Sequence, residues 1–163
     1  MTMRLLATPF KRLRSDRQGG SAVVEFALIL TLMMTLVAGI FEIGRAFWYY
    51  DALTKATRDA ARLMSVTSKT LIASTGVADA KQVVVDAVVS AGVPDFTTPN
   101  VRVTCLTITF IDTVCTDNVA PGGVRVEITG YTLMIGKFIP FLLGSSRSYS
   151  AVLVPHTTMR YML

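Results

Sequence analysis

The sequence predicts an α+β protein in which one long N-terminal helix carries a small domain with a short antiparallel sheet. The first observation is an apolar run from Ala22 to Phe41 that contains a single charge, Glu25, and continues without proline to about residue 65. The second is a change of period, because apolar and polar residues alternate in steps of two after Val101. A helix that leads into such strands has to bury one stripe against them, which gives an α+β architecture.

Composition and charge place the chain at a membrane rather than on nucleic acid. Hydrophobic residues make up 52% and charged residues 17%, whereas about a quarter of a soluble domain is charged. The net charge is +5, and residues 1–20 contribute +4 of it through five basic residues and one acidic residue. Basic residues before an apolar run orient the N-terminus toward the cytoplasm, while a nucleic-acid-binding domain would spread them over a folded face. We expect residues 1–20 to be a basic cytoplasmic leader and expect no nucleic-acid partner.

Residues 21–65 are expected to form one continuous helix. The part from residue 22 to 41 is about 30 Å long at 1.5 Å per residue, enough to cross a lipid bilayer. The helix then becomes amphipathic, and a stripe is expected to pack on the domain: Ile43, Phe47, Tyr50, Leu53, Thr57, Ala60 and Met64. The opposite face is expected to be polar: Glu42, Arg45, Asp51, Lys55, Arg58, Asp59 and Arg62. Gly39 and Gly44 permit either a kink or a close helix contact.

Residues 66–163 are expected to form a small α+β domain. Its expected elements are a loop at 66–80, a short helix at 80–90, a turn at 95–100, strands at 101–110, 124–131 and 148–154, and an apolar connection at 132–144. The β-branched residues of 80–90 also leave a strand open there. Three antiparallel strands are expected to pack on the emerging helix.

The two cysteines, Cys105 and Cys115, follow the apolar run. With a cytoplasmic N-terminus they would lie in an oxidising compartment, where a disulfide closing a loop of about ten residues is expected. Two free buried thiols are the alternative. We expect no metal and no cofactor, because the cysteine spacing is not that of a zinc pair and the single histidine, His156, is distant in sequence.

The sequence Gly20-Ser-Ala-Val-Val-Glu25-Phe26 is the most informative motif. A glycine beside a peptide bond leaves room for a protease to approach the backbone. A charge at the centre of a bilayer costs about 2.5–3.5 kcal/mol, so Glu25 is a functional candidate. Alternatively, Glu25 reaches the cytoplasmic headgroups and has no role. A secretory signal peptide fits this sequence less well, because no small-x-small cleavage site follows the long apolar run.

This motif resembles the processing site of type IV prepilins and pseudopilins. The resemblance implies that a membrane aspartyl peptidase, the prepilin peptidase, cuts between Gly20 and Ser21 on the cytoplasmic side. It also implies that Glu25 meets the new α-amine of a neighbouring subunit in the assembled fibre.

The helix as a whole resembles the TadE-like family of tight-adherence (Tad/Flp, type IVc) pilus systems. The matching segments are Glu25-Phe26-Ala27, Gly39-Ile-Phe-Glu42-Ile-Gly44-Arg45, Ala52-Leu53-Thr54, Ala56 to Arg62, the strand Val124 to Tyr131, Ile139 to Gly144, and Met159-Arg160. A proline often seen mid-span in the family is absent, and Thr31 and Leu32 stand there instead.

This resemblance implies a pilin-like fold and a minor pilin or pseudopilin that supports assembly of a Tad/Flp pilus for surface adherence. It implies a single-pass location in a bacterial inner membrane, with the C-terminal domain in the periplasm and possible incorporation in the pilus. The implied partners are the prepilin peptidase, other pilins and pseudopilins, and the inner-membrane assembly platform. Glu42 and Arg45 would pair internally or across subunits, or form a solvated surface pair, which is the interpretation we favour.

The sequence does not favour an enzyme. Glu127 lies on the polar face of an expected strand, His156 has no evident catalytic partner, and no glycine-rich loop opens a helix. Two other classes stay open: an uncleaved single-pass membrane-anchored periplasmic scaffold or binding protein, and a soluble effector released by a signal peptidase.

Overall fold

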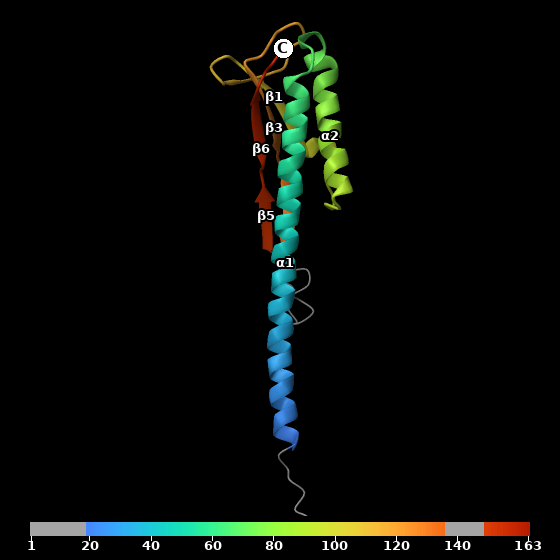
Figure 1. Cartoon of the computed structure of the whole chain (residues 1–163), viewed down its shortest axis with the longest axis vertical. Coiled ribbons are helices and arrows are strands. Elements are labelled where there is room, and N and C mark those ends of the chain that lie inside the picture. Colours follow the sequence, from blue (N-terminus) through green and yellow to red (C-terminus); the bar gives the residue numbers. More distant parts are fainter. Residues whose placement is uncertain (1–18, 136–148) are drawn as a thin grey trace, which may run out of the picture.

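The computed structural model describes residues 19–135 and 149–163, and its dominant feature is one long helix. Helix α1 runs from Gly19 to Ser65, so its 47 residues are about 70 Å long at 1.5 Å per residue. It is a single rod whose C-terminal half carries the rest of the fold (Figure 1). The expected helix at 21–65 is confirmed, and its described part includes Gly19 and Gly20 of the expected leader. Residues 1–18 of that leader lie outside the described residues.

The segment after α1 is helical where a loop was expected. A 3₁₀ turn, η1, covers Lys69–Leu71, a π-helical turn, η2, covers Ile72–Gly76, and helix α2 covers Val77–Ser90. The loop prediction for 66–80 was therefore wrong over most of its length, because local turns rich in Ser and Thr are stabilised by contacts with distant residues. The helix predicted for 80–90 is confirmed, and the strand left open there is not formed. Its buried residues Ala80, Val84 and Val88 recur every four residues and form a helical stripe.

A four-stranded antiparallel sheet packs against the helices, with the strand order β2-β1-β3-β6. Its strands are β1 (Val101–Leu106), β2 (Asp112–Thr113), β3 (Gly123–Ile128) and β6 (His156–Arg160). Between them, a 3₁₀ turn, η3, covers Thr98–Asn100. Strand β3 is central and pairs Val124 with Cys105 of β1 and with Met159 of β6. The two strands expected at 101–110 and 124–131 are present in shorter form.

A separate two-stranded hairpin lies along α1, nearer its N-terminal half than the main sheet (Figure 1). It consists of β4 (Tyr131–Ile135) and β5 (Tyr149–Leu153). Gly130, at φ +69°, permits the turn from β3 into β4. The apolar connection expected at 132–144 is part of strand β4 over residues 132–135, and residues 136–148 lie outside the described part. The strand expected at 148–154 exists but pairs with β4 rather than with the main sheet.

The core lies between the C-terminal half of α1, α2 and the inner face of the main sheet. Fully buried residues from the three layers include Leu53, Ala60, Val84, Val124 and Val126. The expected stripe is confirmed at its C-terminal end by Leu53, Thr57, Ala60 and Met64, which are buried. It was wrong at its N-terminal end, because Ile43, Phe47 and Tyr50 are exposed. The inward face there is formed by Glu42, Ala46 and Tyr49 instead.

Candidate functional site

The expected cleavage position lies in the first turn of α1. Gly20 and Ser21 are helical and exposed, and a Cβ added at Gly20 would meet no atom within 4 Å. Glycine costs about 1 kcal/mol relative to alanine in a helix, and this turn contains two glycines. The first described turn contains no acidic residue that could interact with helix N–H groups. The first turn is therefore open to solvent and only weakly held as a helix.

Glu25 and Phe26 lie on the apolar part of α1, and both side chains are exposed. None of the ion pairs formed within the described chain involves Glu25. Four residues separate Glu25 from Ser21, a rise of about 6 Å along the axis, so the two positions lie about one turn apart. An α-amine created at Ser21 would therefore be close to the level of this carboxylate.

Glu42 and Arg45 form an ion pair where α1 enters the folded domain. Arg45 Nη2 lies 2.6 Å from Glu42 Oε1, and the Glu42 residue is 2% exposed. Arg45 also donates to the carbonyl oxygen of Met134 at 3.4 Å and lies 5.9 Å from the ring centroid of Tyr49. The interpretation of a solvated surface pair was wrong, because β4 packs against this turn and excludes water from Glu42. Gly44, in the same turn, is exposed and has open space around it.

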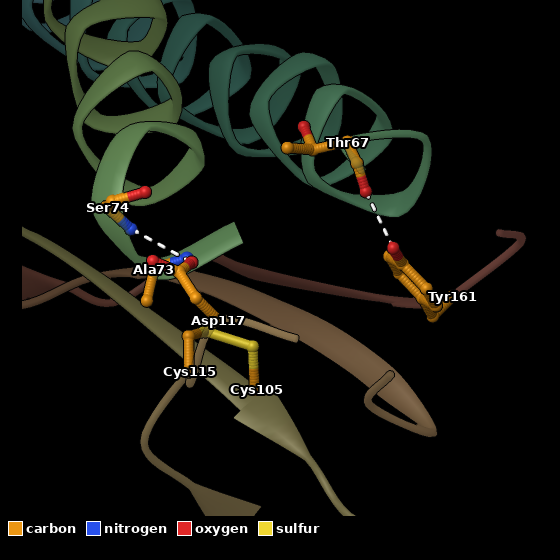
Figure 2. Close-up of a disulfide and its surroundings, with 7 residues drawn as sticks. All are labelled: Thr67, Ala73, Ser74, Cys105, Cys115, Asp117 and Tyr161. Atoms are coloured by element: carbon orange, nitrogen blue, oxygen red, sulfur yellow. Dashed lines mark hydrogen bonds between the residues drawn. A yellow bond between two sulfur atoms is a disulfide. The ribbon is translucent and has the colours of Figure 1, made fainter. Parts of the chain in front are cut away.

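The two cysteines are bonded to each other, with an S–S distance of 2.07 Å, and both are buried. Cys105 lies in β1 and Cys115 follows β2, so the bond closes the hairpin that joins these strands. Asp117 follows two residues later and accepts hydrogen bonds from the backbone N–H groups of Ala73, at 2.7 Å, and Ser74, at 3.2 Å (Figure 2). The hydrogen bond from the Ala73 N–H is the main reason that the pKa of the Asp117 carboxyl lies below its ordinary value; desolvation opposes it, and the Ser74 N–H lowers the pKa further.

The C-terminal residues form hydrogen bonds with the end of α1 and the residues just after it. Tyr161 donates from its hydroxyl to the carbonyl oxygen of Thr67 at 2.7 Å (Figure 2), and the Met162 N–H donates to the Ser65 carbonyl. Burial raises the pKa of the Tyr161 hydroxyl. Sequence reasoning missed these residues, because their partners lie far away in the chain. The structure therefore distributes the expected site residues among three places along the molecule: the start of α1, the turn at Glu42, and the disulfide-closed hairpin.

The described part of the chain presents no recognisable catalytic or metal-binding arrangement. No cluster of three or more His, Cys, Asp or Glu residues is found in residues 19–135 and 149–163. His156 is exposed on β6, and Glu127 lies 3.3 Å from Arg102 in an ion pair on the sheet surface. A groove of about 480 Å³ beside the β1–β2 edge is lined in part by Arg102, Thr104 and Asp112, with no cysteine thiol, serine or histidine to act as a nucleophile or base.

These features define a class: within residues 19–135 and 149–163, one helix is long and apolar enough to cross a membrane, and it is continuous with a small α+β domain. Residues 20–62 match the model of the family described as TadE-like protein. The match begins at Gly20 and stays within α1, so the expected resemblance is confirmed for the helix that contains Glu25, Phe26 and the Glu42–Arg45 turn. The family suggests a structural role in the Tad pilus system. No curated protein and no solved structure matches the chain.

Proposed function

We propose that this protein is a minor pilin or pseudopilin that is processed by a prepilin peptidase after Gly20 and supports assembly of a Tad/Flp-type pilus. The observation that carries the proposal is the family match over residues 20–62, which starts at the proposed cleavage site. In this proposal residues 1–20 are the cytoplasmic leader, 21–65 are a continuous helix that spans the membrane over about 22–41, and 66–163 are the periplasmic domain.

The geometry of the first turn supports processing. A peptidase binds its substrate as an extended strand, so the helix has to unwind around the Gly20–Ser21 bond. Two glycines and the absence of an acidic residue lower the free energy needed to unwind this turn. The bond is also exposed, and nothing in the described structure packs against Gly20.

The exposure of Glu25 supports a role in assembly. Its carboxylate lies on a helix surface that faces lipid in a single protein, where a charge costs about 2.5–3.5 kcal/mol at the bilayer centre. A neighbouring subunit that places its new α-amine beside this carboxylate would neutralise both charges. The gain depends on removal of the leader, because the amine does not exist before cleavage. Cleavage and assembly are thereby coupled through one residue.

Charge and redox chemistry support an inner-membrane location with the domain in the periplasm. The net charge of +4 in residues 1–20 favours a cytoplasmic N-terminus. The Cys105–Cys115 bond lies beyond the span, and disulfides persist in oxidising compartments such as the bacterial periplasm. The proposed partners are accordingly the prepilin peptidase, other pilins and pseudopilins, and the assembly platform, and the proposed role is structural rather than enzymatic.

The experiment is N-terminal sequencing and intact-mass measurement of the protein extracted from native membranes. We expect the chain to begin at Ser21, and we expect Gly20→Val to block processing by filling the space that the peptidase needs. Gly39→Val is the matched control, because it makes the same change in the same helix, also with open space around the Cβ. It should be cut normally.

A chain that keeps residues 1–20 in cells with an active prepilin peptidase would refute the proposal. It would favour the alternative of an uncleaved single-pass scaffold. Complete processing of the Gly20→Val variant would instead refute the assignment of the cleavage site.

A further inference from the structure

An apolar surface, here called the collar, lies on α1 and the adjoining hairpin where the helix meets the domain. We define it as Ile43, Phe47 and Tyr50 of α1 together with Met134 of β4 and Tyr149 and Val152 of β5. These six side chains are between 47% and 70% exposed, although sequence periodicity placed three of them in the core. Ile43, Phe47 and Tyr50 line a shallow apolar hollow together with Leu153, which joins the helix part of the collar to the hairpin.

The β4–β5 hairpin brings its part of the collar to the level of the membrane span. The hydrogen bond from Arg45 to the Met134 carbonyl fixes the end of β4 one turn beyond Phe41, the last residue of the apolar run. Leu153 lies beside Phe47 and Tyr50, and Tyr149 lies four residues, about 13 Å, further along β5. β5 runs along α1, with its start toward the N-terminal half of the helix (Figure 1). Tyr149 is therefore about level with Phe41.

The collar is nearly free of charge. The strands Tyr131–Ile135 and Tyr149–Leu153 contain no charged residue. On α1 between residues 43 and 50 the one charged residue is Arg45, and it is paired with the buried carboxylate of Glu42. Water-facing surfaces of this size normally carry charges of both signs, and a contiguous exposed apolar surface marks a site of membrane or protein contact.

The apolar surface continues past the hydrocarbon core on the side of the domain. From Ala22 to Tyr50 the helix rises about 42 Å at 1.5 Å per residue. A bilayer is about 30 Å thick in its hydrocarbon core and about 40–45 Å thick with its headgroups. The run from Ala22 to Phe41 fills the hydrocarbon core, and the headgroups add about 5–8 Å on each side. Ile43 and Tyr149 therefore fall at the level of the headgroups, a level that aromatic side chains such as Tyr149 favour. Phe47 and Tyr50 lie about 9 and 14 Å beyond Phe41, at and just past the outer edge of that layer.

We propose that the collar is a lipid-binding surface and that the domain sits on the outer leaflet, with the Tyr149 end of the β4–β5 hairpin at the boundary between headgroups and acyl chains. Lipid is the occupant because Ile43, Phe47 and Tyr50 continue the apolar surface of α1, and the hairpin beside them exposes only uncharged side chains. The proposal rests on α1 being a membrane anchor, and it does not depend on cleavage at Gly20. The proposal also explains the arrangement of the turn at Glu42. The Glu42–Arg45 ion pair points toward the domain and Ile43 and Phe47 point away from it, because lipid rather than water lies on the outer side.

The test uses the full chain in phosphatidylcholine vesicles and a tryptophan placed on the hairpin. Trp48 is the single tryptophan, so Trp48→Phe removes the native tryptophan fluorescence. A Val152→Trp substitution added to that variant then reports from β5 alone. Tyr149→Trp is a second reporter that exchanges one exposed aromatic residue for another. Ile108→Trp is the matched control, because Ile108 is 87% exposed and lies beyond the end of β1 that is farthest from β4.

We expect the reporters at positions 152 and 149 to lose fluorescence when the vesicles contain lipids with brominated acyl chains and to emit at shorter wavelength than the control. We expect aqueous iodide to quench the control and not the hairpin reporters. Iodide quenching of the hairpin equal to that of the control, without bromolipid quenching, would overturn the proposal. Protection of the hairpin from both quenchers would also overturn it and would assign the collar to a protein partner such as a second copy.

Vesicle flotation separates failure of the collar from failure of the anchor. A protein that floats with the vesicles but fails the bromolipid test keeps its helical anchor and loses the proposed collar. A protein that does not float would overturn both.

Discussion

Loss of the Cys105–Cys115 bond should weaken the domain without changing its fold. The bond joins residues that are ten apart, and a loop of that size restricts the unfolded chain by about 3 kcal/mol at 25 °C in the chain-entropy model. The folded hairpin keeps other links, because Arg125 bonds Asp112 at 2.8 Å and Thr107 donates to the Ile111 carbonyl. The cost should therefore appear in the free energy of unfolding and not in the helix and strand content.

The assay is urea unfolding of the full chain in detergent micelles, with and without a phosphine reductant. Trp48 fluorescence reports the docking of α1 on the end of α2, since its indole N–H donates to the Ala91 carbonyl at 3.2 Å. The Cys105→Ala/Cys115→Ala variant is the control and should match the reduced protein with or without reductant. A difference below about 1 kcal/mol between oxidised and reduced protein would refute the reasoning, because the closed loop would then not restrict the unfolded chain.

Three further predictions concern the core, a carboxylate and the membrane helix. Leu53→Ala should lower the free energy of unfolding by about 2–5 kcal/mol because Leu53 is fully buried, whereas Ile43→Ala should change it by less than about 0.5 kcal/mol; equal losses in urea titrations would contradict the observed orientation of α1. The Asp117 pKa is lowered by N–H donors, so its stabilising effect is present above the ordinary value of 3.8 and is lost as the pH falls through the lowered pKa. Asp117→Asn should therefore make the urea midpoint less dependent on pH in that acid range, and an unchanged profile would show that the hydrogen bonds do not matter. Glu25→Ala should insert normally, because removal of a charge favours the membrane, but should abolish piliation in electron micrographs, whereas Thr31→Ala should not; normal piliation without Glu25 would leave that carboxylate without a role in assembly.

The parts of the fold that follow from local pattern could be predicted from the sequence. The absence of proline and the long apolar run predicted α1, and the strict alternation of Val124, Val126 and Ile128 predicted β3. Both signals depend on residues that are close in sequence. The cysteine spacing similarly led to the expected disulfide, which the structure contains.

Hydrophobic periodicity failed where α1 enters the domain. Hydrophobic periodicity predicts burial correctly only where one side of a helix faces a core and the other side faces water. Between residues 42 and 50 the outward side continues the membrane-facing surface, so apolar residues such as Ile43 and Phe47 point outward. Glu42 is buried because Arg45 and β4 provide its surroundings, and β4 is about ninety residues away in the chain. Sequence patterns near Glu42 contain no information about that packing.

Strands β4 and β6 were missed for a related reason. Neither has a clear alternation of polar and apolar residues, and each contains five residues. β6 exists because Met159 pairs with Val124 and Thr157 with Val126 of the central strand, which closes the core beside α1. Thr57 of α1 also contacts Thr157 at 3.0 Å. Long-range pairings of this kind decide whether a short segment becomes a strand.

The unbroken α1 has a mechanical consequence. The anchor and the core belong to one stiff helix, because no proline interrupts it and the far half is clamped between α2 and the sheet. The distance from Phe41 to Ser65 is about 36 Å at 1.5 Å per residue, so a tilt of about 20°, typical of membrane helices, moves the far end of the domain sideways by about 12 Å. The tilt of α1 in the bilayer thus sets the position of the domain. A force applied to one end of α1 is transmitted to the other end, because the helix is continuous over its described length.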